Sequence, residues 1–369
     1  MDAVDAWLGT ARNKHARWAY DAERFDHQAT PVHHEPKFTI PAESKFFCIG
    51  SCFARNVEEH LLYSFIDVLS KRVYSPLEEW SNRPNAFMNK YTLALMLNEL
   101  RWVMAPPIDP PAEWFMEVEG GWHDPQLSPA AHPTSLQRVK DRRRYLSTEV
   151  FARIRQADVV VVTLGLVEAW FDNLTGLWLN GAPSLRLARA HPGRYVFRAT
   201  SVFENMAWLE EVRAALKRLS PGVKMVVTVS PVPMDTTFSL KDSAVAHVVS
   251  KARLRVAADE FVSRHEDVDY FPSFEMVSLA PHALAFSDDH IHPNDATVGA
   301  VVRHFVKTFI PDARPPVTGF HEMTYLRSHP DVYAAVRRGE LTSGFEYWMR
   351  EGGHAGAASP QLGPALPSP

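Results

Sequence analysis

The sequence predicts an α/β protein in which a mainly parallel sheet lies between two layers of helices. Three runs are apolar on both faces of an extended strand: "KFFCIG" at 45–50, "ADVVVVTLG" at 157–165 and "VKMVVTVS" at 223–230. Strands of this kind are typical of parallel sheets that helices cover on both sides. Stretches with helical periodicity alternate with them along the chain. We therefore expect a three-layer α/β/α sandwich.

The helices between these strands are predicted from their periodicity. Val57, Leu61 and Leu62 lie on one face of a helix that begins directly after the first strand, and residues 89–104 form a strongly amphipathic pattern. Residues 105–135 are rich in proline and are expected to be irregular. Further helices are predicted at 135–156, 204–219 and 243–265, and a further strand at 268–274.

Composition divides the chain into four parts. Residues 1–40 are expected to form an N-terminal arm with one amphipathic helix and an extended stretch. Residues 41–314 hold the α/β domain. Residues 315–353 are rich in aromatics and are expected to form a small module of two short helical pieces. Residues 354–369 are rich in proline and poor in bulky apolar residues, so we expect them to be disordered.

The bulk composition narrows the class of function. The 369 residues carry a formal net charge of −4, so no broad basic surface is available for a nucleic-acid backbone. The two cysteines cannot build a disulfide framework and lack the spacing of a zinc site, so no metal is expected. No apolar run approaches the ~20 residues of a membrane helix. We expect a soluble cytoplasmic protein without a membrane span; its oligomeric state stays open.

Candidate site residues follow the ends of the predicted strands. In an open parallel sheet, ligands bind beyond the carboxyl ends of the strands. The residues that come directly after each strand are therefore the first to consider. They are Ser51 and Cys52 after the first strand, Gly165, Glu168 and Trp170 after the second, Ser230 after the third, and Glu275 after the last.

A late loop, "FSDDHIHPN" at 286–294, carries Asp289 and His292 in D-x-x-H spacing. A carboxylate three residues before a histidine can accept a hydrogen bond from one ring nitrogen and leave the other free as a base. Among 17 histidines this pattern alone is weak. Together with a nucleophile directly after the first strand, it predicts a nucleophile–His–Asp site.

These two blocks resemble the SGNH, or GDSL-like, hydrolase superfamily, in which the nucleophile follows the first strand in G-D-S and the D-x-x-H pair comes late. The resemblance is closer to the GSCFA family, whose name spells the motif at 50–54. It covers roughly residues 35–310 and implies the α/β/α fold and acyl-transfer chemistry. Further stretches similar to that family are "NKYT" at 89–92, "TLGLVEAW" at 163–170, "TVSPVP" at 228–233, "SKARLR" at 250–255 and "YFPSFE" at 270–275.

Alignment of Gly-Ser-Cys with G-D-S places Cys52 at the nucleophile position. The dipole and free N–H groups of a helix N-terminus favour a thiolate there, and the same N–H groups form part of an oxyanion hole. In this interpretation Asp289 orients His292, which takes and returns protons. Three alternatives stay open: Ser51 is the nucleophile, Ser51 is a helix cap, or Cys52 is an inert buried thiol. Cys48 is expected to be a core residue.

The sequence departs from the superfamily in its third block, G-x-N-D, whose asparagine completes the oxyanion hole. The corresponding residues are Gly165-Leu166-Val167-Glu168, so the amide is missing. Asn89 is a candidate replacement, with a structural role at a helix N-terminus as the alternative.

Other polar and aromatic candidates have two interpretations each. Glu168 and Trp170 either shape a substrate pocket or form a buried ion pair and a core aromatic, and Glu275 is a similar case. Lys251, with Arg253 and Arg255 on the same helix, either binds an anion or belongs to a solvated helix face, and the second account is favoured.

The predicted function is hydrolysis of O-acyl (acetyl) esters through a Cys-His-Asp triad and a thioester. The stretch "YLRSHPDVYAAVRRGELTSGFEYWMREGG" resembles a short repeat appended to bacterial glycan-processing proteins, which favours a carbohydrate-linked ester as the substrate. Two alternatives stay open: an O-acyltransferase that modifies a polysaccharide with acyl-CoA as co-substrate, and a non-catalytic glycan-binding module. No cofactor is expected.

Overall fold

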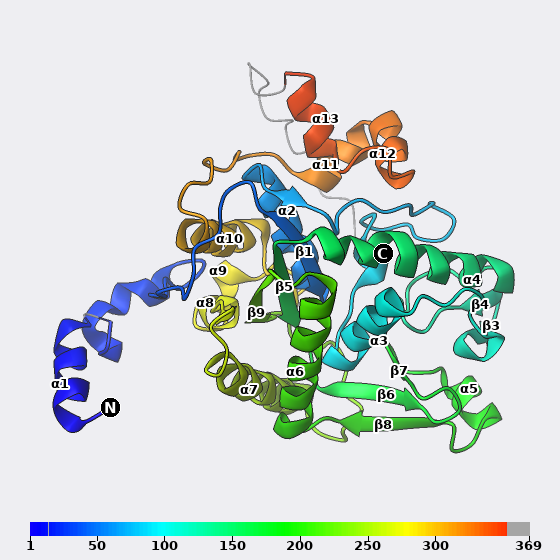
Figure 1. The fold of residues 1–369 in the computed structure, drawn as a ribbon, viewed down its shortest axis with the longest axis horizontal. Coiled ribbons are helices and arrows are strands. Elements are labelled where there is room, and N and C mark those ends of the chain that lie inside the picture. Colours follow the sequence, from blue (N-terminus) through cyan, green and yellow to red (C-terminus); the bar gives the residue numbers. More distant parts are fainter. Residues whose placement is uncertain (14, 353–369) are drawn as a thin grey trace.

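A five-stranded parallel sheet forms the centre of the molecule, and its strand order is β10-β9-β5-β1-β2. Figure 1 shows β9, β5 and β1 side by side among the helices. The computed structural model describes residues 1–13 and 15–352. Helices cover both faces of the sheet, so the predicted α/β/α sandwich is confirmed. The strands are β1 (Lys45–Gly50), β2 (Asp67–Val68), β5 (Val159–Leu164), β9 (Lys224–Val229) and β10 (Val268–Tyr270).

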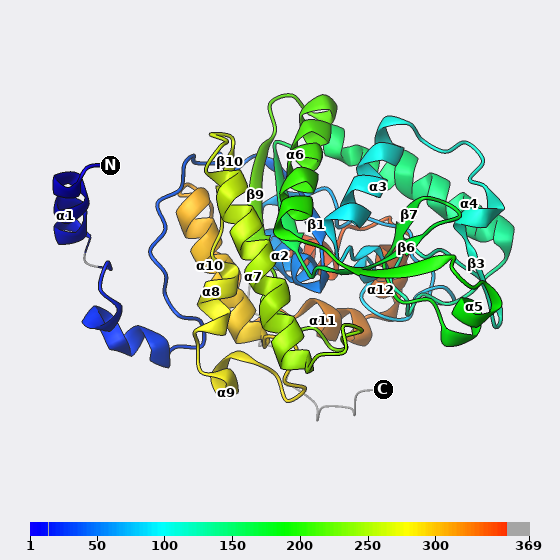
Figure 2. The same ribbon diagram turned by 90° about the horizontal axis from the view of Figure 1, so that it is seen from below.

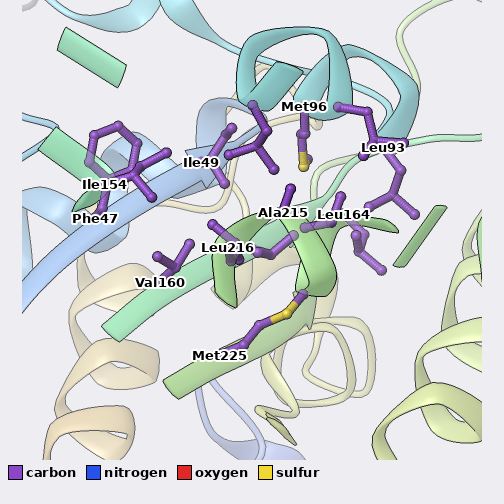
Figure 3. Packing of buried hydrophobic residues seen from close by; sticks show 14 of the residues in the cluster. Phe47, Ile49, Leu93, Met96, Ile154, Val160, Leu164, Ala215, Leu216 and Met225 are labelled. Carbon is purple, nitrogen blue, oxygen red and sulfur yellow. The ribbon is translucent and has the colours of Figure 1, made fainter. Parts of the chain in front are cut away.

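The apolar runs that predict the strands explain why the sheet is buried. All six residues of β5 are buried, and they alternate between the two faces. On one face the sheet packs against α3 (Leu93–Met104), α6 (Val202–Leu219) and α7 (Ser243–Val262); Figure 3 shows part of this cluster. On the other face it packs against α2 (Cys52–Tyr63), α8 (Ser273–Ser278) and α10 (Asp295–Phe309). The carboxyl ends of the parallel strands therefore share one edge.

Two small antiparallel sheets lie outside the predicted elements. Strands β6 (Glu168–Asp172), β7 (Leu177–Leu179) and β8 (Tyr195–Ala199) form one sheet, and β3 (Met116–Val118) and β4 (Gly121–His123) form a hairpin. These strands have three to five residues and are only partly buried, so their apolar alternation is too short to stand out.

Three expectations about the helices and strands are wrong: the number of helical segments in the arm, the start of one helix and the end of the last strand. The arm holds two helical segments, α1 (Ala3–Arg12) and the 3₁₀ segment Trp18–Asp26, where one helix is expected; Figures 1 and 2 show α1 projecting away from the α/β domain, with none of its residues buried. The helix expected at 89–104 begins at Leu93, because Thr92 has extended backbone angles. The last strand ends at Tyr270, since α8 already begins at Ser273.

The C-terminal module has three helices, where two pieces are expected. They are α11 (Glu322–Ser328), α12 (Pro330–Arg337) and α13 (Gly344–Arg350), packed around a small core of Leu326, Val332 and Val336. Arg337 donates to the carbonyl oxygens of Ser75 and Trp80 and so ties the module to the α/β domain. The tail expected to be disordered, 354–369, lies outside the described residues.

The remaining helical segments connect these elements. The expected helix 135–156 consists of α4, a π-helical turn and a 3₁₀ segment in direct succession. Nowhere in residues 1–13 and 15–352 is a helix both long and apolar enough to cross a membrane. The segments are α4 (Leu136–Tyr145), the π turn Leu146–Val150, the 3₁₀ segments Phe151–Gln156, Ala86–Met88 and Ala112–Trp114, α5 (Leu185–Ala190) and α9 (His282–Ala285).

Candidate active site

The turn from β1 into α2 places Cys52 at a helix N-terminus. Gly50 ends β1 with φ +153°, and a Cβ atom there would lie 2.4 Å from the carbonyl oxygen of Thr163 on β5. Only glycine fits this turn. Ser51 occupies the N-cap position and Cys52 is the first residue of α2, half-buried at the carboxyl edge of the sheet. The free N–H groups of the first turn of α2 surround its side chain with positive potential.

A buried polar network fixes this turn. The Arg55 guanidinium donates to the carbonyl oxygen of Cys48 at 2.8 Å and pairs with Glu58 at 2.9 Å. Glu58 also accepts hydrogen bonds from Ser70 and from Asn85, both at 2.5 Å. Because every charge in this network has a partner, α2 is held in one orientation relative to β1.

The loop between α9 and α10 presents Asp289 and His292. A β-bridge between Phe286 and Pro293 closes the loop. Asp289 Oδ2 accepts a hydrogen bond from His292 Nδ1 at 2.7 Å, while Oδ1 accepts from the backbone N–H groups of Ile291 and His292, both at 2.9 Å. Although burial alone would raise it, these hydrogen bonds lower the pKa of Asp289 to about 2. The carboxylate therefore stays charged and holds the imidazole in a fixed orientation.

His292 faces Cys52. Its interaction with the Cys52 thiol is the largest cause that raises the pKa of His292 to about 9, and the hydrogen bond to Asp289 adds to it against the effect of burial. Since Asp289 engages Nδ1, the other ring nitrogen, Nε2, is left for the thiol. The structure thus brings Cys52, His292 and Asp289 together, and their catalytic roles stay a prediction.

The "NKYT" segment lies directly against this turn. The backbone N–H of Lys90 donates to the carbonyl oxygen of Gly50 at 2.7 Å. The Asn89 side chain is buried, and its Oδ1 has no hydrogen-bond partner among the described residues. Ser51 Oγ is likewise buried without a partner in that part of the chain, so Ser51 sits at the N-cap without a side-chain capping bond. Burial raises the pKa of Tyr91, and the nearby Cys52 adds to this rise.

The turn after β5 is held by α7. Gly165 packs so closely on Tyr91 that a Cβ atom would lie 2.5 Å from the Tyr91 carbonyl oxygen. The Lys251 ammonium donates to the Gly165 carbonyl oxygen at 2.6 Å, and the N–H of Val167 donates to Ser250 Oγ at 3.0 Å. Val167, at the position of the missing amide, packs into the core. The favoured account of Lys251 as part of a solvated face is wrong, because the residue is only 2% exposed.

Comparison with known proteins places the chain in a family. The model of the GSCFA family matches residues 45–305. This chain belongs to the GSCFA family. No curated protein sequence matches it significantly.

Solved structures similar to this GSCFA chain have low scores. A carbohydrate esterase family 2 enzyme with a carbohydrate-binding domain from Corynascus thermopiles (Myceliophthora fergusii) has 14% identity over 76% of this chain and 68% of that chain, with a TM-score of 0.32. A carbohydrate esterase family 3 from Talaromyces cellulolyticus has 13% identity over 73% and 99%, with a TM-score of 0.35. Likenesses this distant carry no argument about activity.

Glu168 and Trp170 of the GSCFA chain contact the loop between β9 and α7, which contains Thr237 and Phe238. The Glu168 carboxylate accepts hydrogen bonds from Thr237 Oγ1 at 2.5 Å and from the backbone N–H of Phe238 at 2.9 Å. Trp170 packs against Phe197 and Phe238, with ring centroids 5.3 and 5.2 Å apart. Phe238 is 47% exposed, so this aromatic cluster reaches the surface.

Ser230 and Glu275 form hydrogen bonds with other residues of the α/β domain. The Ser230 N–H donates to the carbonyl oxygen of Leu164, continuing the sheet beyond β9, and the side chain is buried. Glu275 accepts hydrogen bonds from Arg255 at 2.7 Å and from the Tyr270 hydroxyl at 2.9 Å. Within the described ranges, no group of three or more His, Cys, Asp or Glu side chains is placed to hold a metal ion.

Proposed function

We propose that this GSCFA protein is an acyl-transfer enzyme that hydrolyses O-acyl esters with Cys52 as nucleophile, His292 as acid and base, and Asp289 as the group that orients His292. One observation carries the proposal: a half-buried thiol at a helix N-terminus faces an imidazole whose other nitrogen is bound to a carboxylate. This is the arrangement that acyl transfer by covalent catalysis requires.

The first half-reaction forms a thioester. The Cys52 thiolate attacks the ester carbonyl carbon, and the carbonyl π electrons move to the oxygen. The N–H of Cys52 at the N-terminus of α2 stabilises this oxyanion, and we assign the second donor to the buried Asn89 amide, whose neighbour Lys90 bonds the Gly50 carbonyl oxygen. The intermediate collapses, the C–O bond breaks, and the alcohol leaves with the proton of His292. With a pKa of about 9, His292 carries that proton at neutral pH.

The second half-reaction returns the enzyme to its starting state. The now neutral His292 takes a proton from water, whose oxygen attacks the thioester carbonyl carbon. The resulting oxyanion is held by the same donors and collapses to release the carboxylic acid and the Cys52 thiolate. Throughout, Asp289 keeps the proton of the neutral imidazole on Nδ1, so that Nε2 is free to accept one.

The proposed substrate is an acetyl ester on a carbohydrate. Asp289 and His292 have side-chain exposures of 47 and 52%, so a bulky alcohol leaving group has access from solvent. Trp170, Phe197 and Phe238 form an aromatic cluster in which Phe238 is exposed and the other two rings are half-buried, and this cluster offers apolar ring faces to a sugar. The C-terminal segment that resembles a repeat of glycan-processing proteins agrees with this class.

Turnover of nitrophenyl acetate by four proteins, the wild type and three variants, tests the proposal. Cys52→Ala should lose at least about 10³-fold in kcat/KM, as expected when a covalent step is removed. Ser51→Ala should lose much less. Cys48→Ala is the matched control: Cys48 is buried in the core, and its substitution should lower stability while turnover remains. Full turnover by Cys52→Ala, with none by Ser51→Ala, would assign the serine as nucleophile.

A further inference from the structure

Lys251 of α7 is a buried cation to which the proposed mechanism gives no part. The residue is 2% exposed, and its Nζ atom donates to the carbonyl oxygen of Gly165 at 2.6 Å. In the described part of the chain, no carboxylate pairs with it. Since an ammonium has three N–H donors, two remain for other groups. A buried ammonium without a counter-charge is unstable, so the groups that face it determine whether it keeps its charge.

The strand register places Lys251 beside the Cys52 site. Gly50 of β1 pairs with Thr163 of β5, and neighbouring strands lie about 4.8 Å apart. Cys52 and Gly165 each follow this pair by two residues, so both lie at the same edge of the sheet. Lys251 reaches this edge from the face that α7 covers.

Of the titratable groups near Lys251, the Cys52 thiolate is the one that favours its charge. His247 lies one turn earlier on α7, and burial, with Lys251 adding, lowers its pKa to about 4, so it is neutral at pH 7. Tyr91, which lies near Cys52, is neutral too, because burial raises its pKa. His292 on the exposed side of Cys52 is cationic. Burial lowers the pKa of Lys251 to about 7, and Cys52 is the group that opposes this effect.

We infer that Lys251 is a positioning residue of the Cys52 site, which holds the turn at Gly165 and stabilises negative charge on the Cys52 sulfur and on the substrate oxyanion. The part that concerns the oxyanion rests on the proposed function. Lys251 thereby compensates for the amide that the G-x-N-D block would supply, since the corresponding Val167 packs into the core. Unlike a neutral amide, Lys251 in its protonated form offers a full charge, and its bond to Gly165 holds that charge in place.

The test is the pH dependence of Cys52 alkylation by iodoacetamide, measured by mass spectrometry on the full chain. Alkylation requires the thiolate and no turnover. Lys251→Met removes the charge and the hydrogen bond, whereas Lys251→Gln keeps a neutral donor. Both should move the midpoint of the rate profile upward by about one pH unit, which makes alkylation about tenfold slower below the midpoint. An unchanged midpoint in a folded Lys251→Gln variant overturns the inference.

Ser250→Ala is the matched control, because it removes a hydrogen bond that positions the turn and leaves every charge unchanged. Ser250 holds the same turn through the N–H of Val167. Its substitution should leave the alkylation midpoint within about a few tenths of a pH unit of the wild-type value. A midpoint raised as far as in Lys251→Met would mean that both residues act only by holding the turn, and would refute a role for the charge.

A measurement on the wild-type chain covers the case in which the Lys251 variants do not fold. Coupling between two charges is reciprocal, so alkylation of Cys52, which removes its negative charge, should shift the NMR titration of the Lys251 side chain to lower pH. An unchanged titration refutes the inference. Because neither readout needs catalysis, a chain that shows these shifts without ester turnover would refute the esterase and leave the Lys251 assignment standing.

Discussion

Replacement of Asp289 by asparagine tests how the carboxylate acts on His292. The amide of the Asp289→Asn variant can still accept from the backbone N–H groups of Ile291 and His292 through its oxygen. Its NH₂ group then faces His292 Nδ1, which lies 2.7 Å from the carboxylate oxygen in the wild-type protein. The imidazole must accept there, so its proton moves to Nε2, which can no longer take a proton. We expect a loss of about 10³–10⁴-fold in kcat, the size of effect that a wrong tautomer causes.

Charge accounts for only a small part of this loss. Asp289 and His292 are half exposed, with side-chain exposures of 47 and 52%, so solvent screens their attraction. At such an exposed position an ion pair contributes about 1 kcal/mol, which corresponds to a pKa shift of about one unit. Because the carboxylate favours the protonated imidazole, its removal lowers the pKa of His292 from about 9. The basic limb of kcat/KM should therefore move to lower pH by about one unit.

The assay is the pH–rate profile of nitrophenyl acetate hydrolysis, with NMR of the imidazole nitrogens to identify the tautomer. Asp288→Asn is the matched control, because Asp288 is a carboxylate directly before Asp289 in the same loop. The control should keep wild-type turnover and an unshifted basic limb. Retention of most of the wild-type kcat by Asp289→Asn, with the proton still on Nδ1, would refute the reasoning.

Three further predictions concern stability and thiol reactivity. Gly50→Ala should fail to fold or lose several kcal/mol in thermal unfolding, since its Cβ atom would lie 2.4 Å from a carbonyl oxygen of β5; a wild-type midpoint would contradict this. Asp267→Asn should lower the free energy of unfolding by about 1 kcal/mol at pH 7, because two basic partners lower the pKa of Asp267 to about 2 against the effect of burial. That contribution is present above the unfolded value of 3.8 and is lost as the pH falls through about 2, so the difference should vanish in acid; a difference that persists below about pH 2 would show another cause. Iodoacetamide should label Cys52 in the native state and Cys48 only after unfolding, because burial raises the pKa of Cys48; equal native labelling would contradict this.

The central sheet can be predicted because burial on both faces leaves a strong signature. A strand such as "VVVVTL" has no polar face, so only a sheet covered by helices on both sides can accommodate it. The two site blocks are predictable in the same way. Glycine before Ser51 and Cys52 marks a turn that only glycine can make, and the D-x-x-H spacing allows a carboxylate to reach the ring three residues later. In both cases the signal is local in sequence, although the atom that excludes a side chain at Gly50 belongs to Thr163 of β5.

Lys251 shows where local reasoning fails. A basic residue among other basic residues on a helix is usually solvated. The sequence around Lys251 does not indicate that this part of α7 packs at the edge of the sheet. One signal is present: Lys251 shares helical spacing with Leu254, Ala258 and Phe261, which form the buried stripe of α7. A lysine in line with an apolar stripe is buried, and a buried lysine is a candidate for function.

Tyr91 and the two small sheets escape prediction for a related reason. The position of Tyr91 is determined by a contact between segments that are distant in sequence, because its carbonyl oxygen packs on Gly165. Strands β6, β7 and β8 have three to five residues each, too few for a period of two to be told from chance.

The most direct test of the central claim is to trap the acyl-enzyme. The whole chain is mixed with nitrophenyl acetate, quenched in acid during turnover, digested and examined by mass spectrometry. We predict one acetyl group on the peptide that contains Cys52, removed by neutral hydroxylamine as a thioester should be, and absent from Cys52→Ala. An acetyl group on Ser51 that resists hydroxylamine, or steady turnover in Cys52→Ala without any labelled peptide, would contradict the assignment of Cys52 as the nucleophile.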